Sequence, residues 1–316
     1  MVISKWRYSL SRLQTQVKQV WLVSAYNFRG WHKNPRIIIT FALAFILCFL
    51  LSDKTVRFAN EMDSIMQIAE AFIWTFGDAD SILLSSLLLL LLFADMPFIN
   101  RGTPFYLLRL SGNQRRTWLF GQGLYVALAT CIYMVFILLS TGVVCMQKSF
   151  VGNMWSETAA ILGYSGVGQE IALPALVKTL ESTLPYQAMF SIFTLMLLYT
   201  LLMAFIMLFF SIAKGAKGQL AGVVAALAFS LYGFLLSPEL IKTLFTLDTA
   251  QMYKANVAMG WISPLNHATY HMHNFGFDRL PCLWHSYCIF AGLTVVLFVL
   301  TLIAVRRYNF DFKGGG

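Results

Sequence analysis

The hydrophobic positions of this chain fall into long runs separated by shorter polar segments. Six runs predict membrane-spanning helices, since a span needs about 20 predominantly apolar residues. Proline marks several ends: Asn34-Pro35 and Leu184-Pro185 open spans, whereas Pro97 and Ser237-Pro238 close them. The predicted spans are residues 35–51, 81–98, 119–146, 189–212, 220–236 and 285–305.

A second periodicity precedes the first span. Apolar residues recur at steps of three and four, which places them in one stripe along a helix, and basic residues lie off that stripe. We therefore predict an amphipathic helix in residues 1–34 that lies in the cytoplasmic interface, its basic face toward anionic headgroups. A cytoplasmic helix packed on a partner is the alternative. The stripe consists of Trp6, Leu10, Leu13, Val17, Val20, Trp21, Ser24, Phe28 and Trp31.

Composition agrees with a membrane protein. Hydrophobic residues make up 58% of the 316 residues and charged residues only 12%, whereas soluble domains carry about 25% charged residues. The predicted fold is an all-α integral membrane protein with six transmembrane helices. Its predicted parts are the interfacial helix in 1–34, the six-span domain in 35–308 and a cytoplasmic tail in 309–316.

The distribution of charge predicts the orientation in the membrane. With the N-terminus inside, sixteen of the 23 Lys and Arg residues lie on the inner side and twelve of the fourteen acids on the outer side. This agrees with the positive-inside rule, so both termini are assigned to the cytoplasm. The net charge of +9 therefore belongs to one side of a membrane and does not suggest a nucleic-acid partner.

The connection from Asp95 to Trp118 carries the strongest functional signal. Thr103-Pro104 predicts the start of a short helix and Ser111-Gly112 its end. Its apolar residues are surrounded by arginines with no acid among them, a pattern that suits docking into a groove of a partner. An ordinary inner loop whose arginines hold the cytoplasmic side is the alternative. The apolar residues are Phe105, Tyr106 and Leu108, and the arginines are Arg101, Arg109, Arg115 and Arg116.

The chain shows no energy source of its own. From the third to the sixth predicted span the apolar core contains no Asp, Glu, Lys or Arg, whereas ion-driven carriers usually need such a group at the midplane. The phosphate-binding pattern GxxxxGK[ST] is also absent. We therefore expect no cofactor bound by this chain, and any ATP and Mg²⁺ to be held by a partner.

The ordered layout, together with the segments FADMPFINRGTPFYLLRLSGNQRRTWLFGQGLY and GWISPLNHATYHMHNFG, resembles the ABC-2 type transporter permeases of bacteria. This resemblance implies that residues 101–116 are a coupling helix seated on a separate ABC ATPase subunit. It further implies that residues 237–284 form outer helices between spans five and six, and that two permease copies, or two related permeases, pair with two ATPases. The large second outer segment, 147–188, departs from the family pattern.

Aromatic residues in the outer segments and Leu, Phe and Met in the spans predict the cargo. We expect export of an amphipathic or hydrophobic molecule, such as a peptide antibiotic, a lipid or a drug. On this interpretation the chain is a transport subunit and not itself an enzyme.

Two other functions remain open from the sequence. His267 and His271 are four residues apart and could share a helical face as metal ligands of a membrane-embedded enzyme, with His273 and Asp278 nearby. The pattern HExxH is absent, so packed or surface histidines are the simpler interpretation. A sensor or immunity protein that binds a peptide without moving it is the other alternative.

Overall fold

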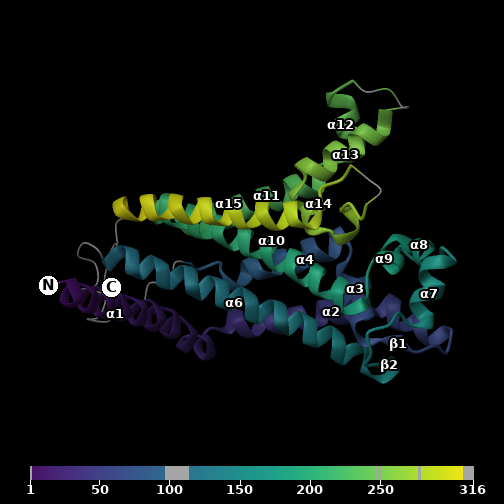
Figure 1. Cartoon of the computed structure of the whole chain (residues 1–316), viewed down its shortest axis with the longest axis horizontal. Helices are drawn as coiled ribbons and strands as arrows, with labels where there is room; N and C mark the ends of the chain where they lie inside the picture. The colour runs from purple at the N-terminus through teal and green to yellow at the C-terminus, as the bar shows by residue number, and fades with distance from the viewer. Residues whose placement is uncertain (1, 97–113, 247, 249–250, 277–278, 309–316) are drawn as a thin grey trace.

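The computed structural model describes residues 2–96, 114–246, 248, 251–276 and 279–308, and is almost entirely helical. Five of its helices are long and apolar enough to cross a membrane. They are α2 (Pro35–Glu61), α6 (Gln114–Cys145), α10 (Pro185–Ala213), α11 (Gly218–Leu235) and α15 (Leu283–Ala304). These helices run along the long axis of the molecule (Figure 1). The prediction of an all-α membrane protein is therefore confirmed in its class.

The predicted second span is a bent pair of helices. α3 (Ile68–Phe76) and α4 (Ala79–Leu92) meet at an angle of 87°, and only together do they qualify as a sixth span. With 14 residues, α4 has a length of about 21 Å, which is less than the apolar thickness of about 30 Å. The predicted span 81–98 is therefore not a long helix of its own: the described residues contain five helices long enough to cross a membrane, or six spans if the bent pair counts as one.

Residues 53–80, between the first two predicted spans, are also mostly helical. Residues up to Glu61 continue α2, and α3 begins after a capping box in which Gln67 and Glu70 satisfy each other's backbone N–H groups. α3 is buried along nearly its whole length. Glu70 in this helix is fully buried, and its carboxylate accepts hydrogen bonds from the backbone N–H groups of Gln67 and Ser156.

Several predicted helix ends are confirmed. The side chain of Asn34 accepts a hydrogen bond from the backbone N–H of Arg36 at 3.1 Å, with Pro35 at the first helical position of α2. Pro185 opens α10 in the same way, and Ser237 caps the short α12 (Pro238–Leu244) after α11 has ended. These signals act within one helical turn, which is why sequence alone locates them.

Helix α10 forms the centre of the bundle. It is apolar on every side, and it packs against α11, α15, α6, α3 and α4. Along α11, the buried positions are small residues at steps of three to four. These are Gly218, Gly222, Ala226, Ser230 and Gly233. The small residues let the α10 and α11 backbones approach closely, as is common between helices in membranes.

The helical segment predicted between spans five and six is present. It contains α12, α13 (Met252–Ile262), α14 (Pro264–Ala268) and the 3₁₀ turn η5 (Tyr270–Met272). Figure 1 shows α12 and α13 standing away from the bundle, whereas α14 lies against it. α14 contacts α10, α11 and α4.

Residues 146–184 fold onto the same end of the bundle as α3. Their elements are η2 (Met146–Lys148), β2 (Ser149–Phe150), α7 (Glu157–Tyr164), α8 (Val167–Glu170) and α9 (Val177–Ser182). Strand β1 (Met66–Gln67) pairs in parallel with β2, as the only sheet in the described part of the chain. We call β1, α3 and residues 146–184 together the cap.

Helix α1 (Val2–Arg29) confirms that the N-terminal segment is helical and shows which face is packed. The helix lies beside the first half of α6 (Figure 1). Val23 is buried against Gly121, where any added Cβ atom would lie 2.5 Å from the Val23 Cβ. Val17 and Trp21, predicted on the apolar stripe, are 61% and 57% exposed, so only one side of the stripe contacts the bundle.

Candidate functional site

The predicted docking segment is bounded by two anchored ends. Residues 97–113 lie outside the described part of the chain, so the structure does not place Arg101, Thr103, Pro104, Phe105, Tyr106, Leu108 or Arg109. The residues on both sides of this gap are described. We call their surroundings, at the end of the bundle where α2 and α6 begin, the inner junction.

Asp95 connects the chain that leads into residues 97–113 to neighbouring helices. Its carboxylate lies 3.5 Å from the guanidinium of Arg36 and accepts a hydrogen bond from the Asn34 amide at 3.5 Å. Its backbone carbonyl accepts a hydrogen bond from Gln219 Nε2 at 2.9 Å. The chain leaving α4 is therefore tied to the first turns of both α2 and α11.

Arg115 holds the second end. It lies in the first turn of α6, and its guanidinium donates to the carbonyl of Arg306 at 2.9 Å and to that of Tyr308 at 3.4 Å. These carbonyls belong to the end of η6 (Val305–Arg307), where a helix terminus favours a positive charge. Arg116 beside it is exposed. The intramolecular role of Arg115 was not predicted from the sequence.

Aromatic contacts join α1 to the same junction. Phe28 packs on Trp31 and on Tyr125, with ring centroids 4.9 Å apart in both cases. The indole N–H of Trp31 donates to the Tyr125 hydroxyl at 2.9 Å, and the Asn27 amide donates to Gln122 at 3.0 Å. Phe28 is thus a packing residue between α1 and α6. Trp6, Leu10 and Leu13 lie earlier in the same helix, and placement of α1 in a membrane interface stays a prediction.

The histidines of residues 267–273 do not form the metal pair that was considered as an alternative. α14 ends at Ala268, so His267 and His271 do not share a helical face. His271 is turned toward the bend between α3 and α4, where its Nδ1 lies 3.1 Å from the carbonyl of Gly77. No three His, Cys, Asp or Glu side chains come together as metal ligands in the described residues, which do not include Asp278.

His267 and His273 meet instead at a serine. His267 Nδ1 and His273 Nε2 each lie 2.7 Å from the hydroxyl oxygen of Ser286, in the first turn of α15. All three side chains are buried, with exposures of 3%, 0% and 0%. A serine so enclosed has no access to a substrate, which argues against a nucleophilic role. Burial also lowers the pKa of each of the two imidazoles, to about 4 for His273.

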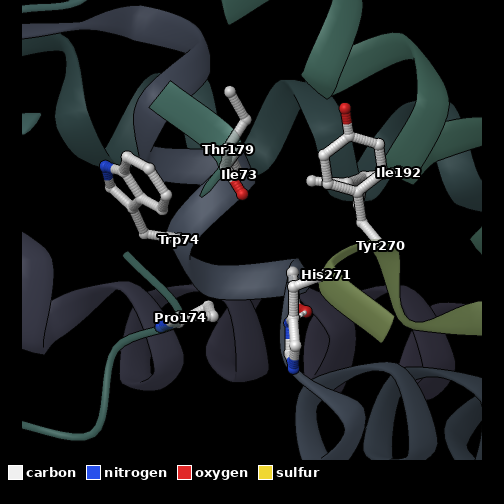
Figure 2. Close-up of a pocket in the computed structure, with 8 residues that line it drawn as sticks. Ile73, Trp74, Pro174, Thr179, Ile192, Tyr270 and His271 are labelled. Carbon is white, nitrogen blue, oxygen red and sulfur yellow. Dashed lines mark hydrogen bonds between the residues drawn. The ribbon is translucent and has the colours of Figure 1, made fainter. Parts of the chain in front are cut away.

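A small cavity lies where η5 meets the α3–α4 bend. Its lining includes Trp74, Pro174, Tyr270 and His271, and Figure 2 shows Trp74 and Pro174 on one side of it and Tyr270 and His271 on the other. Its volume of about 10 Å³ corresponds to a single water site. Ligand pockets usually measure about 300–1,000 Å³, so this cavity is not a cargo site.

Comparison with known proteins adds no identification. No protein-family model matches the chain, and no curated protein sequence matches it. The functional interpretation therefore rests on the residues and on their geometry.

Proposed function

We propose that this chain is the membrane subunit of an ATP-driven exporter, with ATP and Mg²⁺ bound by separate ABC ATPase subunits. A second copy of the chain or a related permease would complete the complex in the lipid bilayer of the plasma membrane. The cargo is amphipathic or hydrophobic, and both termini lie in the cytoplasm. The proposal extends the resemblance to ABC-2 permeases.

The observation that carries this proposal is the anchoring of the basic segment at both ends. Asp95 connects it to α2 and α11, and Arg115 connects it to the end of the last helix. We infer that a displacement of residues 97–113 by a partner would reach α2, α11 and the end of the last helix through these contacts. Coupling of this kind requires a partner that binds the segment differently in two states.

The spans themselves favour an external energy source. α10, α11 and α15 contain no Asp, Glu, Lys or Arg, and α6 contains only Arg115 and Arg116, both in its first turn. A proton or sodium ion crossing this bundle would find no charged ligand on these helices.

Large exposed aromatics in α13 and in the first turn of α15 favour an amphipathic cargo. Trp261 is 44% exposed and Trp284 71% exposed. Indole rings combine a large apolar surface with one hydrogen-bond donor, which suits molecules with both apolar and polar parts.

Cysteine labelling tests the orientation. Asp63→Cys, beside Lys148 in the cap, is expected to react in intact cells with an impermeant maleimide, whereas Gly112→Cys is expected to react only after the membrane is opened. The five native cysteines are first replaced, because three of them are exposed in the described structure. The reverse labelling pattern would contradict the proposed topology.

Replacement of Phe105 by aspartate tests coupling. A charge placed in the apolar centre of the predicted contact lacks a partner and costs several kcal/mol, so the ATPase is expected to dissociate or to hydrolyse ATP without transport. The measurement is ATPase activity copurifying with the tagged chain from its native membranes. Leu108→Asp is expected to behave in the same way.

Asn113→Asp is the matched control, because it adds the same charge to the same segment outside the predicted apolar face. It is expected to retain most of the ATPase. If Phe105→Asp inserts, keeps its ATPase and transports at the normal rate, the segment is a spacer and the coupling role is wrong.

A further inference from the structure

The His267–Ser286–His273 cluster has more acceptors than donors when both histidines are neutral. His267 Nε2 lies 3.0 Å from the carbonyl of Trp261, and His273 Nδ1 lies 3.0 and 3.1 Å from the carbonyls of Thr269 and Tyr270. A carbonyl only accepts, so each of these nitrogens carries a hydrogen. In the neutral rings, His267 Nδ1 and His273 Nε2 are then both acceptors.

Both of these acceptor nitrogens face one hydroxyl group. Ser286 has a single hydrogen to donate, and its oxygen lies 2.7 Å from each ring nitrogen. In the neutral cluster one contact is a hydrogen bond, and the other opposes two lone pairs inside a buried site. One additional proton removes the conflict: one imidazolium donates to the Ser286 oxygen, and the Ser286 hydrogen is donated to the other imidazole.

We propose that His267, Ser286 and His273 form a proton-binding site in which one proton is shared between the two rings through the serine hydroxyl. Transfer of the Ser286 hydroxyl hydrogen to the neutral ring, while the imidazolium proton moves to the serine oxygen, interconverts the two states in which either His267 or His273 is the imidazolium. No atom is lost or gained in that exchange. The shared proton joins residues 261–273 to the first turn of α15.

The groups around the cluster favour the binding of one proton and disfavour the binding of a second. Helices α10 and α11, packed against α14, present no Asp, Glu, Lys, Arg or His. A second positive charge would therefore be buried beside the first without an acid in contact. The surrounding elements carry titratable or charged groups that include Tyr253 and Lys254 on α13, Tyr199 on α10, Asp78 before α4 and Asp80 in it, Tyr270 and His271 on η5, His285 and Tyr287 on α15, Lys178 on α9, and Arg279.

Nuclear magnetic resonance of the full-length chain, labelled with ¹⁵N-histidine in detergent micelles, tests the site. On titration from pH 8 to 3, the rings of His267 and His273 are expected to share one midpoint, each with only part of the shift of a full imidazolium. Free histidine in the same buffer supplies the reference for a full shift. Single His→Gln variants assign the signals.

Ser286→Ala removes the bridge and is expected to lower proton affinity about tenfold, a shift of about one pH unit, and to abolish the common midpoint. In His273→Gln, His267 is the one histidine left in the cluster, and its ring is expected to show a transition of full amplitude. This variant tests the proposal even if Ser286→Ala does not fold. Separate full-amplitude transitions in the wild type, or two rings that stay neutral throughout, would overturn the proposal. Neither outcome bears on whether an ATPase partner exists.

Discussion

Gly222→Leu is expected to separate α10 from α11 and to prevent stable folding. A Cβ atom at this position would lie 2.5 Å from the Ser211 hydroxyl oxygen and 2.6 Å from the carbonyl oxygen of Met207, and the second of these belongs to the α10 backbone. Overpacking in a close-packed interior typically costs about 1–3 kcal/mol. A whole leucine against helix backbone is expected to exceed that range. Thermal unfolding in detergent measures the effect.

Gly292→Leu is the matched control for this prediction. Gly292 lies in α15 with no other atom within 4 Å of its added Cβ, so the same substitution finds open space there. Its melting temperature is expected to stay near that of the wild type. Equal stability of the Gly222 and Gly292 variants would mean that α10 and α11 do not pack through their small residues.

Glu70→Gln is expected to detach residues 146–184 from α3. The Glu70 carboxylate accepts from the backbone N–H of Ser156 at 2.7 Å, from the Ser156 hydroxyl at 2.5 Å and from the backbone N–H of Gln67 at 3.2 Å. Each partner is a donor, so a glutamine would turn its own NH₂ group toward at least one of them. An unsatisfied buried donor costs about 1–3 kcal/mol, which is expected to lower the melting temperature and to speed proteolysis within 146–184.

Glu61→Gln provides the comparison for this variant. Glu61 is exposed in the last turn of α2, so loss of its charge is expected to change stability little. If Glu70→Gln resists proteolysis as well as Glu61→Gln does, the carboxylate does not hold the cap together.

Local signals explain what the sequence predicted correctly. Asn34-Pro35, Leu184-Pro185 and Ser237-Pro238 act within one turn, so the starts of α2 and α10 and the end of α11 could be predicted. Long apolar runs identified the five long helices in the same way. The fold class could therefore be predicted from local sequence patterns.

Long-range contacts explain what the sequence missed. Glu70 is buried and hydrogen-bonded to Ser156, which is 86 residues away in the sequence, and α3 packs into the bundle. The sequence also did not indicate the partners of the histidines: the helix ends at Ala268, His271 is turned away from His267, and His273 lies against Ser286. At the inner junction, no pattern near Arg115 indicated that the carbonyl of Arg306 would be its acceptor.

Uptake into inside-out vesicles from native membranes tests the proposed function most directly. With hydrolysable ATP, the vesicles are expected to accumulate at least one probe from a panel containing a fluorescent lipid, a cationic amphipathic peptide and a hydrophobic dye. Uptake is expected to stop when ATP is replaced by a non-hydrolysable analogue, and in the Phe105→Asp variant. It is expected to persist in the Asn113→Asp variant, and also after the proton and sodium gradients are collapsed. Accumulation that needs an ion gradient and not ATP, or that is confined to hydrophilic solutes, would contradict an ATP-driven exporter of amphipathic cargo.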